Sequence, residues 1–180
     1  MKKRLFCLIV ILAVLSGCAQ DKMEVSFYTE RQLIIGVVGE PPVQKGHTVI
    51  YEKITFEELQ NIEYLSDFDA VFITKDNLFQ AANKEFKSVY KTANIPFFFI
   101  QSTKSHIPFT HEELSYEAVP DLSPDMYATG YFKNRDEDLI WGYGLHNNEE
   151  NQINIEDVYT RIFQTIASID KERNEHDESI

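Results

Sequence analysis

Three short apolar runs constrain the fold of this chain more than any other feature. They are Leu33–Val38, Ala70–Ile73 and Ile95–Ile100, and polar or turn-forming residues bound each of them. Continuous apolar runs of this length favour strands that are buried on both faces, as in the centre of a parallel sheet. Pro96 is compatible with the third strand because it falls near the strand start, where a missing N–H is tolerated.

Helical patterns separate these runs. The first covers residues 56–65, and the second covers residues 78–93 with Asp76 as its expected N-cap. Apolar side chains recur in the second at steps of three and four, which gives one buried face: Leu78, Phe79, Ala82, Phe86, Val89, Tyr90 and Ala93. The alternation of strand and helix predicts parallel pairing with right-handed crossovers.

The C-terminal part follows a different pattern. Residues 48–51 are compatible with a short extra strand, and residues 127–132 and 139–145 predict two strands joined by a polar hairpin link, 133–138. A final helix, with Asn154 as its expected cap, would bury one apolar face: Ile155, Val158, Tyr159, Ile162, Phe163, Ile166 and Ile169. We therefore expect an α/β three-layer sandwich with a parallel central sheet and an antiparallel C-terminal edge. Its topology would be flavodoxin-like or Rossmann-like by analogy.

Residues 1–18 have the pattern of an export signal. Three cations, Lys2 to Arg4, precede an apolar run at 5–15 that is too short to span a bilayer, which takes about 20 residues. The string Leu15-Ser16-Gly17-Cys18 resembles the lipobox of bacterial lipoproteins. That resemblance implies removal of residues 1–17 and acylation of Cys18, for example with palmitate. The alternative is an ordinary signal peptide with an incidental cysteine.

The expected organisation follows from this signal. Cys18 and a polar tether to residue 30 would precede one α/β domain at 31–170 and an acidic tail without regular structure at 171–180. The chain has 2 cysteines. Cys7 would leave with the signal and Cys18 would carry lipid, so disulfides and thiolate chemistry are not expected. The body is also similar to small lipoproteins of Gram-positive bacteria, without a diagnostic motif.

The charge balance restricts the partners. The formal net charge is −12, and the acidic excess is concentrated in residues 112–180. Nucleic-acid binding needs clustered Lys and Arg and is not expected, and neither is electrostatic attachment to anionic lipid. The expected location is therefore the extracytoplasmic face of a cell membrane, with lipid as the attachment. The acidic half is either a surface for a cation or basic partner, or a solvated face.

Polar segments follow the three apolar runs. They are 39–42, 74–77 and 101–106, and they should meet because ligands bind beyond the carboxyl ends of parallel strands. The candidate ligand-binding residues are Lys75, Asp76, Ser102, Thr103, Lys104 and His106. For residues 101–106 the alternative is a polar surface loop.

Motifs for catalysis and for metal binding are incomplete. Pro41-Pro42 follows Gly36 and Gly39 where a phosphate-binding loop would need more glycines or a lysine, so both glycines are interpreted as turn and packing residues. Ser102 and Lys104 lack the Ser-x-x-Lys spacing, and there is no Gly-x-Ser-x-Gly string. We expect no catalytic residue, no metal and no cofactor.

Two groups of acidic or histidine side chains are further candidates for a site. His106 and His111, with Glu112 and Glu113, resemble zinc ligands in composition but not in spacing. The stretch 117–125 contains Glu117, Asp121 and Asp125, which would form either a carboxylate pair or simply turns.

The aromatic segment Trp141-Gly142-Tyr143-Gly144 allows two interpretations. With Tyr127 and Tyr131 it could line a groove, or these rings could be core and hairpin packing. Together these patterns predict a non-catalytic domain that binds a small ligand or an envelope protein. The alternative is an envelope-acting hydrolase or transferase that uses Lys75, Asp76, Ser102, Lys104 and His106 at the strand ends.

Overall fold

The computed structural model describes residues 26–43, 48–124, 126–135 and 137–177, with side chains described as far as Ile169. The predicted signal, Cys18 and most of the tether lie outside the described residues. A single six-stranded sheet has the order β2-β1-β3-β4-β5-β6. The strands are β1 (Leu33–Val38), β2 (Val49–Lys53), β3 (Ala70–Ile73), β4 (Phe97–Ile100), β5 (Met126–Asn134) and β6 (Glu137–Gly144).

Strand directions confirm an α/β fold with a mostly parallel sheet and an antiparallel C-terminal edge. The pairs β1–β2, β1–β3 and β3–β4 are parallel, whereas β4–β5 and β5–β6 are antiparallel. The three apolar runs form β1, β3 and β4, and Pro96 lies just before β4. The hairpin is tighter than predicted, because β5 extends to Asn134 and β6 begins at Glu137, with Arg135 in the left-handed region at φ 53°.

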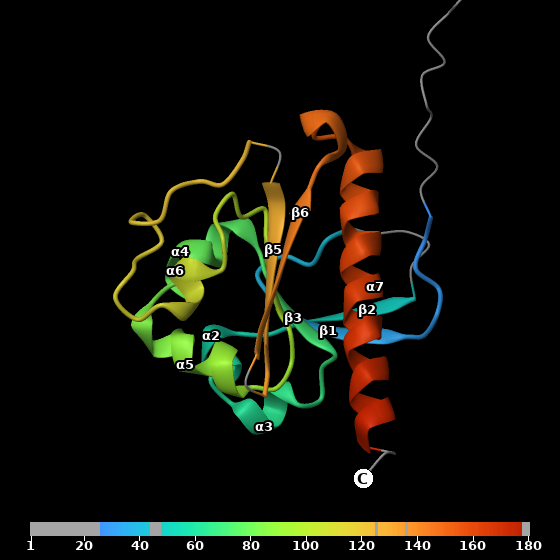
Figure 1. Ribbon diagram of the computed structural model, residues 1–180, viewed down its shortest axis with the longest axis horizontal. Helices are drawn as coiled ribbons and strands as arrows, with labels where there is room; N and C mark the ends of the chain where they lie inside the picture. Colours follow the sequence, from blue (N-terminus) through green and yellow to red (C-terminus); the bar gives the residue numbers. More distant parts are fainter. Residues whose placement is uncertain (1–25, 44–47, 125, 136, 178–180) are drawn as a thin grey trace, which may run out of the picture.

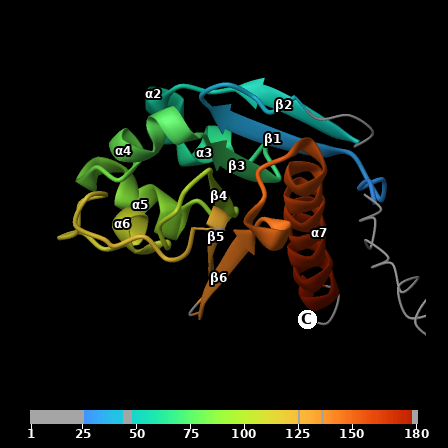
Figure 2. The ribbon, with the colours of Figure 1, turned by 90° about the horizontal axis from the view of Figure 1, so that it is seen from above.

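Helices cover both faces of the sheet, which gives three layers (Figure 1 and Figure 2). One face packs against α7 (Gln152–Asp177) through Leu33, Ile35 and Phe72, and the other face packs against the helices between 56 and 110 through Val38, Val71 and Phe97. Alternate residues of each central strand enter opposite cores because side chains alternate across a strand. Both faces are buried, and this is why the three runs are apolar without alternation.

The helical layer opposite α7 is more broken than predicted. The first expected helix is two turns, α2 (Phe56–Leu59) and α3 (Ile62–Leu65). Thr55 and Glu58 form a capping box on α2, and the Asn61 side chain accepts from the Tyr64 N–H to cap α3. The second N-cap, Asn61, comes six residues after the first, Thr55, and this favours two separate helical turns over one continuous helix.

The second expected helix is also divided. It consists of η1 (Lys75–Asn77), α4 (Leu78–Ala81) and α5 (Lys84–Thr92), and α6 (Ile107–Thr110) lies beyond β4. The prediction that Asp76 caps this helix is wrong, because Asp76 lies inside η1 and no cap hydrogen bond is present there. The break rotates Phe79 out of the core, and 59% of its surface is exposed.

The long helix α7 begins earlier than predicted, after η2 (His146–Asn148). Asn151 occupies the capping position, since its side chain accepts from the Asn154 N–H at 3.0 Å. The Asn154 side chain instead donates to the carbonyl oxygens of His146 and Glu149 and fixes the preceding turn. The predicted apolar face is confirmed, and the helical backbone continues through Asp177, past residue 170. No helix within the described part of the chain is both long and apolar enough to cross a membrane.

Candidate functional site

A cleft of about 400 Å³ lies at the carboxyl ends of β1, β3 and β4, beside the start of α7. We call it the strand-end cleft. Its lining comes from five segments far apart in the sequence: Glu40, Pro42, Val43, Thr74, Lys75, Asp76, Ile100, Gln101, Tyr127, Gln152, Ile155 and Tyr159. Two of the predicted ligand residues, Lys75 and Asp76, are therefore brought to the expected edge of the sheet.

Gly39 shapes one side of the strand-end cleft. Its φ of +116° is a conformation that other residues rarely adopt, and a Cβ placed there would lie 2.0 Å from Thr74 Oγ1 and 2.5 Å from Asn77 Nδ2. Thr74 and Asn77 both donate to the Val38 carbonyl, at 3.3 and 3.4 Å. The chain therefore turns tightly after β1 against the end of β3, and the interpretation of Gly39 as a turn and packing residue is confirmed.

Two tyrosines line the cleft on its inner side. Tyr127 from β5 and Tyr159 from α7 meet with ring centroids 6.4 Å apart and planes at 78°. Burial raises the pKa of both phenols, so both hydroxyls stay protonated at neutral pH. Neutral hydroxyls that donate as well as accept are suited to ligands that carry hydroxyl, carbonyl or amide groups.

A second layer of polar groups lies next to these tyrosines. Glu156 is only 8% exposed, and its carboxylate accepts from Gln152 Nε2 at 2.8 Å. Tyr51 on β2 packs against Phe72, and its buried hydroxyl has no hydrogen-bond partner among the described residues. Burial raises the pKa of Tyr51, and the negative charge of Glu156 raises it further. A buried hydroxyl without a partner is costly, so Tyr51 is a point of local instability beside the cleft, although it does not line it.

The rim of the strand-end cleft carries charges of both signs. Glu40 and Asp76 supply two carboxylates against the single cation Lys75. Glu40 also accepts from Lys53 Nζ at 2.7 Å across the first crossover. Because this pairing neutralises Glu40, the net charge of the rim is small, and the described lining holds no cluster of cations that would favour a phosphate over a neutral ligand.

The other four candidate residues are not in the strand-end cleft. Gln101 has a φ of 57°, which turns the chain sharply at the end of β4, and only Gln101 from the segment 101–106 lines the cleft. Ser102, Thr103, Lys104 and His106 are directed to the long loop that precedes β5. Sequence alone could not locate this turn, because a left-handed glutamine carries no sequence signal.

Two of these residues, Thr103 and Lys104, hold the long loop in place. The Thr103 hydroxyl donates to Asp121, and Lys104 Nζ donates to Asp121 at 3.3 Å and to the Val119 carbonyl at 2.6 Å. The bond from Thr103, and then that from Lys104, lowers the pKa of the Asp121 carboxyl. Ser102 is fully buried, and within the described ranges its hydroxyl bonds only to the Lys104 backbone. Asp121 thus anchors a turn, while Asp125 lies outside the described residues.

His106 is part of the packing against Tyr131. Their rings are nearly parallel, at 5° with centroids 5.8 Å apart. Burial lowers the pKa of His106, neighbouring His111 lowers it further, and Asp138 acts in the opposite direction. No group of three or more His, Cys, Asp or Glu side chains that could hold a metal ion occurs in the described ranges.

Comparisons with known proteins give no further guide. No family model, curated protein or solved structure matches this chain. The function must therefore be inferred from the site itself. Gln152 and Tyr159 were not predicted as site residues, because the helical pattern around them is indistinguishable from core packing in the sequence. Tyr127 was predicted either to line an aromatic groove with Tyr131 and Trp141 or to be packing, and it lines the strand-end cleft without those two residues.

Proposed function

We propose that this chain is a lipoprotein anchored through Cys18 to the extracytoplasmic face of a membrane, and that its α/β domain binds a small polar ligand without catalysis. The observation that carries the binding proposal is the strand-end cleft, in which polar groups of five segments converge on two buried tyrosines. Clefts of this kind, with a few polar groups above an apolar floor, are the usual sites of small ligands.

The sheet order supports this position for a site. We propose a flavodoxin-like arrangement, because β1 lies between β2 and β3. The chain passes from β1 to β2 on one side of it and then crosses to β3 on the other side. In open α/β sheets this reversal of strand order opens a crevice at the carboxyl ends of the strands, where ligands bind. The strand-end cleft lies at those ends of β1 and β3.

The chemistry of the lining supports a neutral or cationic ligand with hydroxyl or amide groups. Gln101 and Gln152 can each donate and accept, and the tyrosine hydroxyls can do the same. Ile100 and Ile155 add an apolar surface for a ring or short carbon chain. The net negative charge of the chain disfavours a phosphate.

Binding is favoured over catalysis by where the reactive groups lie. A hydrolase or transferase would need a nucleophile and a base within hydrogen-bond reach of one another in the cleft. Ser102 is buried away from it, His106 packs on Tyr131, and Lys104 bonds to Asp121. None of these three lines the strand-end cleft.

The test is a thermal-shift panel on the full chain in a nonionic detergent. Matched pairs such as glucose with glucose 6-phosphate, and serine with phosphoserine, separate neutral from phosphorylated ligands. We expect stabilisation by members of the neutral set and loss of that shift in Gln152→Trp, which fills the cleft. The matched control is Gln80→Trp, at an exposed position on α4. No shift with any compound, or equal shifts in both variants, would contradict the proposal.

A further inference from the structure

The outer edge of β6 and the neighbouring face of α7 enclose a second groove, of about 610 Å³, that is separate from the strand-end cleft. We call it the edge groove. Its lining comes from one strand and one helix only: Ile140, Trp141, Gly142, Tyr143, Arg161, Gln164, Thr165 and Ser168. Figure 2 shows β6 at the margin of the sheet with α7 alongside.

The edge of β6 presents main-chain groups in a regular row. In the described part of the chain β6 pairs only with β5. The hairpin pairs Asn134 with Glu137. From there on, the main-chain N–H and C=O groups of alternate β6 residues bond to β5, and those of the intervening residues point away from β5. Those are Asp138, Ile140 and Gly142, and next in the series is Gly144.

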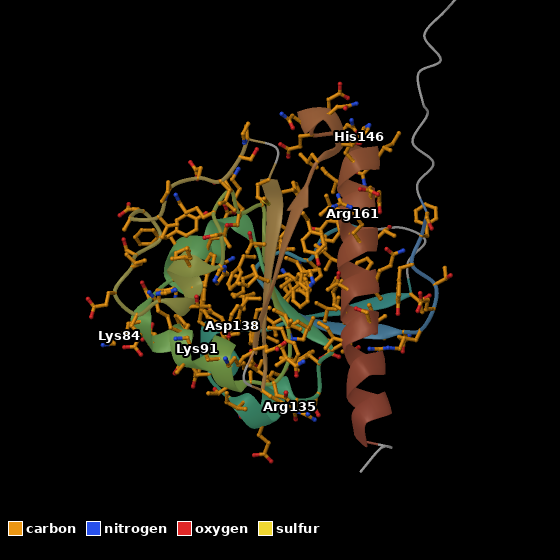
Figure 3. All side chains as sticks on the ribbon, viewed as in Figure 1. Lys84, Lys91, Arg135, Asp138, His146 and Arg161 are labelled. Atoms are coloured by element: carbon orange, nitrogen blue, oxygen red, sulfur yellow. The ribbon has the colours of Figure 1, made fainter. Side chains whose placement is uncertain are left out.

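Arg161 supports this assignment. Its Nη2 donates to the Gly144 carbonyl at 2.7 Å, so that carbonyl does point away from β5. Arg161 also pairs with Asp157 and lies over the Tyr143 ring. It closes one end of the edge groove, while Asp138 marks the other end of the open stretch; Figure 3 labels both residues. The open stretch from 138 to 142 spans about 17 Å, the length of a typical strand.

The middle of this edge lacks the usual protection. Natural edge strands are commonly blocked by charges, proline or a covering segment. Charges occur on β6 only at its hairpin end, at Glu137 and Asp138, whereas Ile140 is 48% exposed and Gly142 offers no side chain to keep another backbone away. The sheet therefore ends in a long edge whose outward N–H and C=O groups match those of another extended chain.

We propose that the edge groove binds an extended, basic segment of a partner polypeptide, which adds to the sheet as a seventh strand beside β6. Its alternate side chains would enter the groove between Trp141 and the α7 residues Gln164 and Thr165. The others would lie on the opposite face, beside Ile140 and Asp138. The proposal does not depend on the strand-end cleft.

Charge selects this occupant. The edge groove belongs wholly to the acidic half of the chain, and the formal net charge is −12. Asp138 at one end is paired with Lys133 and Asp157 at the other end is paired with Arg161, so the negative field at the groove comes from the acidic half as a whole and not from these two carboxylates. Lys or Arg on the added strand is favoured by this field, whereas a second copy of the same acidic chain would be repelled.

The experiment uses two fluorescent peptides, one alternating Lys and Val and one alternating Glu and Val, with the full chain in a nonionic detergent. We expect the basic peptide to bind at least about tenfold more tightly than the acidic one. We expect it to slow hydrogen exchange at the Ile140 and Gly142 amides. Gln164→Arg, which places a cation in the groove wall without touching β6, should weaken binding by about tenfold or more, and Gln80→Arg on α4 is the matched control.

Three outcomes would overturn the proposal. The first is an absence of added protection at Ile140 and Gly142. The second is binding that does not depend on charge in the groove: an equal effect of Gln164→Arg and Gln80→Arg on the affinity for the basic peptide, or equal affinity of the wild-type chain for both peptides. The third is protection of these amides without peptide that grows with protein concentration alongside a doubled mass, which would identify a second copy as the occupant.

Discussion

Tyr127 and Tyr159 meet at the strand-end cleft with ring centroids 6.4 Å apart and planes at 78°. The two residues come from β5 and α7, so this contact joins the antiparallel edge of the sheet to the helix that covers it. Tyr51 lies near them, with a hydroxyl that has no hydrogen-bond partner among the described residues. Tyr143, in the same core, does have a partner, because its hydroxyl donates to Thr165 Oγ1 at 2.9 Å.

Removing a bonded and an unbonded hydroxyl should have different effects. Tyr143→Phe removes the hydrogen bond from the Tyr143 hydroxyl to Thr165 Oγ1 and should lower the free energy of unfolding by about 1 kcal/mol. Tyr51→Phe removes an unpaired hydroxyl and should leave the free energy of unfolding unchanged or raise it. Denaturant unfolding of the two variants beside wild type makes the comparison. A clear loss of stability in Tyr51→Phe would show that its hydroxyl is bonded in solution.

Gly39→Ala should strain the turn that forms one side of the cleft. A Cβ would collide with Thr74 in a backbone conformation that only glycine adopts easily, so we expect a loss of about 2 kcal/mol in the free energy of unfolding. Gly142→Ala is the control, because its Cβ would meet only the flexible end of Met126 at 3.2 Å. Equal losses in the two variants would contradict the assigned role of Gly39.

His106 should contribute to the pH dependence of stability. Its pKa is lowered in the folded state by burial, so the folded protein favours the neutral ring. The stabilisation is therefore complete above the unfolded pKa of about 6.5 and is lost as the pH falls through the folded value. Between pH 7.5 and 5, His106→Gln should lose less stability than wild type. The exposed His146→Gln should follow wild type, and a His106→Gln profile that coincides with it would contradict this role.

Lipid attachment should depend on one residue. Radiolabelled palmitate fed to expressing cells should label the wild-type chain, and Cys18→Ala should remove the label and leave the chain unprocessed or released from the membrane fraction. Cys7→Ala is the matched control and should be labelled like wild type. Full labelling of Cys18→Ala would contradict the anchor.

The central sheet was predictable because burial on both faces dictates its composition. Leu33–Val38 and Ala70–Ile73 form β1 and β3 as expected, and the α7 face was visible from its spacing. Breaks within helices were less accessible, because the N-caps at Thr55 and Asn61 compete with a continuous apolar stripe.

The cleft was predictable in position but not in membership. Lys75 and Asp76 could be placed because parallel strands end at one edge. The other predicted residues, Ser102, Thr103, Lys104 and His106, do not line the cleft, because the left-handed residue Gln101 redirects the chain. Hydrogen bonds to Asp121 then hold Thr103 and Lys104 against the long loop. Tyr127 and Tyr159 belong to the cleft only through tertiary packing between β5 and α7.

The most direct test of the binding proposal maps a bound compound on the protein by NMR. Each stabilising compound of the thermal-shift panel would be titrated into isotope-labelled full chain while backbone amide shifts are recorded. We predict saturable changes at Lys75, Gln101 and Gln152, around the strand-end cleft, with those at 103–106 unaffected. Changes confined to 103–106 or to the edge groove, or no saturable change with any compound, would contradict the account.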